Sequence, residues 1–232
     1  MLGRPPSTPA EGRIATGPAL LARFGRAREG GAAVEFALVV PVLLMIWAGV
    51  TEYAHAVDNS RKLVQLARTV SDLTSSGDPG NGDTTNQGRA MRQSVIDDVL
   101  AASATVLRPF SSTTTKIVIS AVTPSTLSLN AVPYVCSSVA NGNATSRPTG
   151  IAAALPVPVG YQTTGLRYIV TEVSMVYRPM IGSTLVRLFT WERSTITLTA
   201  VEPWPTRGGR TQGANTYTEI ILPGGNACPA VT

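Results

Sequence analysis

Histidine and cysteine are almost missing from this chain of 232 residues, which contains one His and two Cys. The only histidine, His55, has no acid or nucleophile placed by the sequence to complete a hydrolytic triad. Neither Cys136 nor Cys228 has a further Cys or His close enough to suggest a zinc set. A phosphate-binding loop and a Gly-x-Gly-x-x-Gly motif are also missing. The sequence therefore predicts a protein that is not an enzyme and needs no metal or cofactor.

Charged residues are scarce as well, at 14% of the chain, although the net charge is +5 and the pI is about 9.6. Residues 1–30 hold five Arg and two Glu, a net charge of +3, which leaves only +2 for residues 31–232. No later stretch combines a basic run with interleaved aromatics, so nucleic-acid binding is not predicted. The basic N-terminus is better explained as a segment held at a cytoplasmic membrane surface.

One long apolar run, from Gly31 to Val50, is interrupted by a single carboxylate, Glu35. Twenty residues in a helix are just enough to cross a hydrocarbon core of about 30 Å. An ionised Glu within a membrane helix costs on the order of 3 kcal/mol on insertion scales, so it predicts a functional residue with a compensating partner. Pro41 lies inside the run and predicts a kink rather than a break.

Three interpretations of this run compete. It can be a plain membrane anchor with Glu35 at the boundary. It can be a secretory signal cleaved after Ala54-His55-Ala56, although the long segment before it and the polar residues after it speak against this. It can also be a leader of the prepilin type, in which cleavage follows a glycine and a Glu stands at the fifth mature position.

The third interpretation fits the residues around Gly30. The chain continues from there as Gly-Ala-Ala-Val-Glu-Phe, which is the pattern of class III prepilin leaders. This resembles the TadE-like family of the tight-adherence (Tad, Flp-type) pilus machinery, which comprises minor pilins or pseudopilins. The resemblance continues in Arg68 to Leu73 (RTVSDL), after the apolar run, and in Val173 to Pro179 (VSMVYRP), late in the chain.

The resemblance implies a minor pilin or pseudopilin of a Tad type IV pilus system. A prepilin peptidase would cut between Gly30 and Gly31, and Glu35 would then neutralise the freed amine inside the bilayer. Phe36 stands where the major pilin usually has Tyr, which favours a minor subunit. The implied partners are the inner membrane, other Tad pilins or pseudopilins, the assembly platform and the prepilin peptidase. The alternative is an uncleaved single-pass anchor whose external domain binds a partner through loops between Pro124 and Gly165.

Charge near the apolar run predicts its orientation. Arg28 lies three residues before Gly31, whereas the first base after Val50 is Arg61, eleven residues away. We therefore expect a single-pass protein of the inner (cytoplasmic) membrane, with a cytoplasmic N-terminus and a periplasmic C-terminal domain. The expected domains are a leader (residues 1–30), a transmembrane helix (31–52), a membrane-proximal amphipathic helix (53–75) and an extracytoplasmic TadE-like α+β domain (76–232).

Periodicity predicts an α+β, pilin-like fold: a long N-terminal helix, a second helix and a small antiparallel sheet. The first helix should run from about Ala32 to Leu73, with a buried apolar stripe after the membrane. The stripe consists of Leu63, Leu66, Val70 and Leu73. The later elements are a turn at Ser75 to Gly88, a helix at Arg89 to Leu107, and strands at Lys116 to Val122, Arg167 to Tyr177 and Ser194 to Val201.

The remaining stretches are rich in Pro, Gly and Ser. Pro124 to Gly165 is predicted to form long surface loops with a short strand near Val132 to Cys136. Order in the tail from Pro203 to Thr232 should depend on Cys228. Export would permit a disulfide between Cys136 and Cys228, the alternative being two unpaired, partly buried thiols.

Overall fold

The computed structural model describes residues 30–78, 90–125, 131–163, 165–179, 195–211 and 218–229. The chain divides into two compact units, residues 1–49 and 50–232. The basic leader before Gly30 and most of the predicted turn from Ser75 to Gly88 lie outside the described residues.

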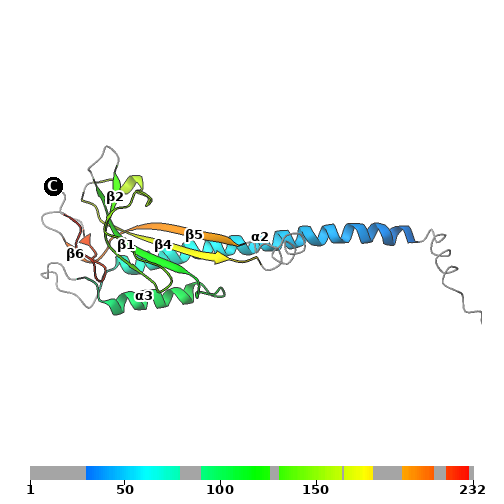
Figure 1. Cartoon of the computed structure of the whole chain (residues 1–232), viewed down its shortest axis with the longest axis horizontal. Helices are drawn as coiled ribbons and strands as arrows, with labels where there is room; N and C mark the ends of the chain where they lie inside the picture. Colours follow the sequence, from blue (N-terminus) through cyan, green and yellow to red (C-terminus); the bar gives the residue numbers. More distant parts are fainter. Residues whose placement is uncertain are drawn as a thin grey trace, which may run out of the picture. The chain divides into compact units, whose positions relative to one another are not determined.

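The N-terminal element is a single helix, α2, which runs from Gly31 to Ser75 and contains Pro41 (Figure 1). Just after the helix, Gly77 has a positive φ of 76°, and its N–H donates to the carbonyl of Thr74 at 3.1 Å. A side chain at Gly77 would also clash, because a Cβ there would lie 2.9 Å from the backbone N of Gly209. The helix predicted from Ala32 to Leu73 is therefore present and extends slightly at both ends.

Beyond α2 the second unit contains one antiparallel sheet of five strands in the order β3-β2-β1-β4-β5. The strands are β1 (Lys116–Ser125), β2 (Val132–Ala140), β3 (Gly150–Ile151), β4 (Tyr168–Tyr177) and β5 (Ile196–Pro205). A separate pair, β6 (Arg210–Thr211) with β7 (Thr218–Glu219), follows β5. A 3-10 turn, η3 (Val159–Tyr161), precedes β4. The α+β class predicted from the sequence is confirmed.

Strand β2 includes the short strand predicted near Val132 to Cys136 but is longer, so less of Pro124 to Gly165 is loop than the sequence predicted. It is nine residues long and pairs with β1 from Val132 opposite Ser125 to Ala140 opposite Val118. The register shifts between Ala121 and Val122. Such a bulge moves later side chains to the other face, so the burial pattern of β2 is not a simple alternation along its whole length.

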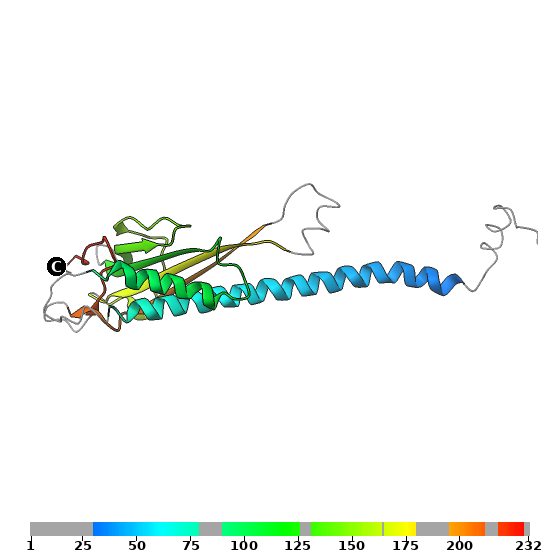
Figure 2. The same ribbon diagram turned by 90° about the horizontal axis from the view of Figure 1, so that it is seen from below.

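Two helices cover one face of the sheet. The second half of α2 and helix α3 (Gln93–Val106) lie side by side there, as both views show (Figures 1 and 2). The main core forms between them and the strands. Its buried members include Leu63, Leu66 and Val70 of α2, Ile96 of α3, and Ile117, Ile119, Ile169 and Val173 of the sheet.

The prediction that Leu73 belongs to the buried apolar stripe of α2 is wrong. Leu73 is 42% exposed, whereas Ala67, Ser71 and Thr74 are buried. The contact face of α2 therefore turns toward small and hydroxyl side chains as it approaches its end. These residues allow the helix to lie close to the strands.

A smaller apolar cluster lies around Val122, Val135, Leu155, Tyr168 and Val170, with Ala152 and Tyr161 packed against it. The rings of Tyr161 and Tyr168 are 5.0 Å apart and tilted. The segment after β3, which was predicted to be a surface loop, thus contributes a second, small core.

Candidate assembly site and the domain that carries it

The first turns of α2 form an almost wholly exposed apolar surface. Phe36 is 70% exposed and Leu38 is 71% exposed. Other large apolar side chains exposed on this stretch are Val34, Val39, Val42, Leu43, Leu44, Met45, Ile46, Trp47 and Val50. An apolar surface of this size is stable only when lipid or protein covers it. Among the described residues, α2 is the one helix long and apolar enough to cross a membrane, which indicates a membrane anchor.

Glu35 is the only carboxylate on this surface, and it is exposed. It stands four residues after Gly31, the first residue of α2. Residues at this spacing lie on the same face of a helix, one turn apart. A new amine at Gly31 would therefore lie within reach of a carboxylate at Glu35, either on the same helix or on a neighbouring one.

Gly30 and Gly31 have open space around them. A Cβ added at either position would meet nothing within 4 Å. Larger residues can therefore stand here without disturbing the packing of the described residues. A consequence of such a substitution would have to arise from recognition by another protein.

Farther along, α2 contacts the end of the sheet. The Tyr177 hydroxyl, at the end of β4, donates to Glu52 Oε1 at 2.5 Å. Burial, and then this hydrogen bond to a carboxylate, raises the pKa of Tyr177 to about 12. The sequence did not indicate this pair, because 125 residues separate its members.

The segment from Arg68 to Leu73 attaches α2 to β4 and β5. Ser71 Oγ donates to Thr171 Oγ1 at 2.8 Å and lies 3.2 Å from the Glu202 carbonyl oxygen. Arg68 pairs with the Glu202 carboxylate at 3.4 Å, and Asp72 pairs with Arg207. The polar residues of this motif therefore hold the helix against the sheet.

The segment from Val173 to Pro179 forms the end of β4. Val173, Met175 and Tyr177 alternate toward the helices and are buried, whereas Val176 and Arg178 are exposed. The two later motifs of the resemblance thus belong to one interface, in which α2 packs on β4.

The two cysteines form a disulfide, as the sequence predicted, across 92 residues. Cys136 is in β2, and Cys228 lies after β7, so the bond fastens the C-terminal tail to the sheet. Both residues are buried.

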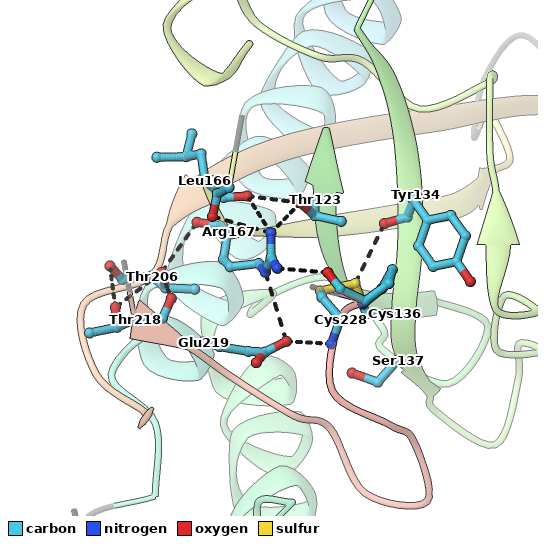
Figure 3. A network of polar contacts seen from close by, with 12 residues as sticks. Thr123, Tyr134, Cys136, Ser137, Leu166, Arg167, Thr206, Thr218, Glu219 and Cys228 are labelled. Carbon is cyan, nitrogen blue, oxygen red and sulfur yellow. Dashed lines mark hydrogen bonds and ion pairs between the residues drawn. A yellow bond between two sulfur atoms is a disulfide. The ribbon is translucent and has the colours of Figure 1, made fainter. Parts of the chain in front are cut away.

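A buried ion pair beside the disulfide holds the same tail (Figure 3). The Arg167 side chain is 4% exposed and lies 3.8 Å from Glu219, whose side chain is 1% exposed. Arg167 also donates to Thr123 Oγ1 at 2.5 Å and to the Pro229 carbonyl at 3.1 Å. Glu219 in turn accepts the backbone N–H of Cys228. Desolvation lowers the pKa of Arg167, and the Glu219 carboxylate opposes that shift.

The only histidine of the chain, His55, and the adjacent pair Asp97 and Asp98 lie on different helices. His55 is exposed on α2, and Asp97 and Asp98 are exposed on α3, where Asp97 accepts a hydrogen bond from Gln93. Within the described ranges, no group of three or more His, Cys, Asp and Glu could hold a metal ion.

These features define a class: an α+β domain on a single apolar helix that is suited to a membrane. A family model described as TadE-like protein matches residues 30–72, which confirms the resemblance to the TadE-like family over this helix. A TadE-like segment indicates a protein associated with the Tad pilus. No curated protein and no solved structure matches the chain.

Proposed function

We propose that the protein is a minor pilin or pseudopilin of a Tad pilus system. It would act by helix packing in the inner membrane after cleavage of its leader between Gly30 and Gly31. The observation that supports this most is the family match, which begins at residue 30, together with the start of α2 at Gly31. The remaining partners would be other Tad pilins or pseudopilins, the assembly platform and the prepilin peptidase.

In this proposal Glu35 guides assembly. The freed amine of Gly31 and the Glu35 carboxylate would offset each other's cost in the bilayer, within one subunit or between two. Phe36 and the apolar residues after it would pack against neighbouring helices. Close packing, rather than hydrophobicity, drives association between helices in lipid.

The orientation belongs to the same proposal. Arg28, three residues before Gly31, and the arginines before it favour a cytoplasmic N-terminus, which would put the second unit in the periplasm. An oxidising compartment agrees with the disulfide between Cys136 and Cys228.

Cleavage is tested at Gly30, where a larger residue meets no other atom of the described structure. We expect Gly30→Leu to leave a precursor about 30 residues longer in a gel, and N-terminal sequencing of the wild type to begin at Gly31. Gly49→Leu, at another open position of α2, is the control and should mature normally. A wild-type N-terminus before Gly30 would instead support the uncleaved anchor, and one at Val57 a secreted protein.

The role of Glu35 is tested separately. Glu35→Ala should insert at least as well as the wild type, because a costly charge is removed, but it should not enter pili. Glu52→Ala removes a carboxylate that bonds Tyr177 and serves as the comparison, since its effect should fall on the second unit. Normal piliation by Glu35→Ala would rule out the assembly role.

A further inference from the structure

The five-stranded sheet has two outer edges, and within the described part of the chain only one of them is covered. Strand β3 pairs with the first half of β2. In the second half of β2, Ser137 and Ser138 accept the N–H groups of Leu222 and Arg147. The edge at β2 is therefore covered by other parts of the chain. At the opposite edge, no described segment pairs with the outer side of β5.

The hydrogen bonds of β1 show which neighbour each backbone group of the sheet faces. The N–H of Ile117 donates to Asn141 Oδ1 at 3.1 Å, and its C=O accepts the N–H of Asn141 at 3.0 Å, so both groups face β2. Backbone groups of successive residues in a strand point to opposite sides. Val118 therefore faces β4 and forms a hydrogen-bonded pair with Glu172, which is opposite it.

The same alternation continues from β4 to β5. Val173, the next residue of β4, faces β5 and pairs with Ala200. The backbone N–H and C=O groups of Thr197, Thr199 and Val201 therefore point away from the sheet. Because Ala200 belongs to the main core, the side chains of these three residues lie on the open face, away from α2 and α3, and they are exposed. Among the described residues, their outward backbone groups have no partner.

Two prolines agree with this assignment and limit the open part of the edge. Pro203 and Pro205 follow Val201 at intervals of two, so the N–H that each lacks would point outward, where its absence leaves the pairing with β4 intact. A strand that docks on β5 can therefore use only Ile196–Val201, about 20 Å of backbone. Exposed backbone donors and acceptors of this kind bind a further strand in β-augmentation.

The direction of β5 excludes a second copy of this chain as that strand. Tyr177, at the end of β4, bonds Glu52, which follows the apolar run by two residues. Since β5 is antiparallel to β4, it begins near this end of α2 and runs away from it. Copies anchored in one membrane therefore carry parallel β5 strands, and antiparallel pairing between them would require anchors that point in opposite directions. In parallel pairing, copies at the same height would place carbonyl opposite carbonyl.

The position of this edge along α2 indicates where the partner is held. Ile196, the first residue of β5, is opposite Tyr177, whose bond to Glu52 places it beside the first turn of α2 after the apolar run. A strand on Ile196–Val201 therefore lies within about 25 Å of the end of that run. A protein anchored in the same membrane can present a strand at this height.

We propose that Ile196–Val201 of β5 binds an extended strand of a different protein that is anchored in the same membrane. The strand runs toward the membrane, antiparallel to β5, and exchanges backbone hydrogen bonds with Thr197, Thr199 and Val201. Its side chains on the open face lie beside those three residues, a position that suits β-branched residues. The inference requires only the membrane anchor. Under the proposed function, the partner is another Tad pilin or pseudopilin.

The test uses the full-length chain in cells that naturally produce it. A photoreactive benzoylphenylalanine replaces Thr197, Thr199 or Val201, one position at a time, and each crosslinked product is sequenced by mass spectrometry. Opposite residues of an antiparallel pair follow each other in reverse order. We therefore expect one partner, labelled two positions earlier in its sequence at each step from Thr197 to Val201. Val118, on the same face but two strands from the edge, is the control position and should give no such product.

Proline substitutions test whether backbone hydrogen bonds hold the partner. Thr199→Pro removes an outward N–H and, as at Pro203, leaves the pairing with β4 intact. With the photoreactive residue at Val201, it should reduce the product by about fivefold or more, because a hydrogen bond is lost and the ring obstructs the next strand. Thr199→Val keeps the N–H, so it is the matched control and should form the product normally. Circular dichroism should show an unchanged fold for Thr199→Pro, whereas Ala200→Pro, whose N–H faces β4, should lose stability.

Four results would overturn the proposal. One is a product that joins two copies of this chain. Another is a partner labelled at one fixed residue, or in the same order as the probe positions, which would show that no antiparallel strand is bound. The third is equal product from Thr199→Pro and Thr199→Val, and the fourth is no crosslinked protein from any of the three positions. Gly30→Leu retains the anchor and should form the same product, which separates this inference from leader cleavage.

Discussion

Arg167 is buried at the start of β4, where a charged residue next to a strand would ordinarily be read as exposed. Nothing in the sequence points to Glu219 as its partner, because the two are brought together only when the tail returns to the sheet. A buried charge that loses its partner is costly. The ion pair is therefore a feature that sequence reasoning missed and that the tertiary structure alone reveals.

We expect Arg167→Met to lower the free energy of unfolding by about 3–5 kcal/mol, because Glu219 would be left charged and buried. The double variant Arg167→Met/Glu219→Met should recover part of this loss. Thermal unfolding of the full chain in detergent, followed by circular dichroism, provides the measurement. Arg147→Met is the control. Its ion pair with Glu172 is partly exposed, so its cost should be about 1 kcal/mol. Equal losses at Arg147 and Arg167 would contradict the argument from burial.

Tyr177 gives a prediction about pH. Its folded pKa of about 12 lies above the unfolded value of about 10, so the phenol favours the folded state while it remains protonated. This stabilisation is complete below pH 10 and is lost as the pH rises toward 12. We expect urea unfolding to show a steeper loss of stability between pH 10 and 12 for the wild type than for Tyr177→Phe.

Tyr168 also has a raised pKa, caused by burial and then by Tyr161, and it contributes to the same alkaline loss in both proteins. The difference between the wild type and Tyr177→Phe therefore isolates Tyr177. If the two curves are parallel from pH 9 to 12, folding does not raise the pKa of Tyr177.

Among the elements, α2 was the most accurately predicted, because the apolar run and the later helical spacing indicate one continuous helix. Strand β2 was predicted only in part, near Val132 to Cys136, although it extends to Ala140. Pro133, Ser137 and Ser138 are poor strand signals, and the strand exists because its backbone pairs with β1. The contact face of α2 was predicted from large apolar residues, which identified Leu63, Leu66 and Val70. The pattern of large apolar residues could not identify Ser71, whose burial depends on Thr171 in the facing strand.

Two Leu→Asp substitutions on α2 should differ in their effect on stability, because one lies on the contact face and the other does not. Leu66 is 0% exposed and Leu73 is 42% exposed. Leu66→Asp buries an unpaired charge and should lower the melting temperature of the second unit, at a cost of roughly several kcal/mol. Leu73→Asp should change stability by no more than about 0.5 kcal/mol. Circular dichroism of both full-length variants in detergent measures this. An unchanged melting temperature for Leu66→Asp would show that the helix is not docked on the sheet.

For the whole molecule, the division into residues 1–49 and 50–232 predicts that assembly and stability can be altered independently. Ala37 is exposed on α2, in the part that we propose packs against other subunits. We expect Ala37→Trp to weaken crosslinking between subunits in the membrane, because small residues allow close helix contact. The melting temperature of the second unit should stay the same. A parallel fall in both quantities would mean that the two units are coupled.

For the candidate sites too, the sequence identifies residues that are adjacent in the chain but not those that only the fold brings together. Gly30, Gly31, Glu35 and Phe36 are adjacent in the sequence, so a local pattern was sufficient to propose them. An open groove with His55, Phe110 and Arg178 combines a helix, a turn and a strand end. Phe110 reaches this groove from the turn after α3, and Arg178 reaches it from the end of β4, so no local pattern could indicate it.

The disulfide between Cys136 and Cys228 can form only late in synthesis of the chain. All five strands of the sheet are complete in the sequence before Cys228 is reached. A chain that emerges from a ribosome or a translocation channel N-terminus first therefore presents Cys136 alone for the next 92 residues. During that interval the thiol is open to alkylation, and it becomes protected once its partner arrives. A pulse of a thiol reagent during synthesis would therefore label Cys136 in chains that have not yet reached Cys228. The extent of labelling would report how many chains are still incomplete.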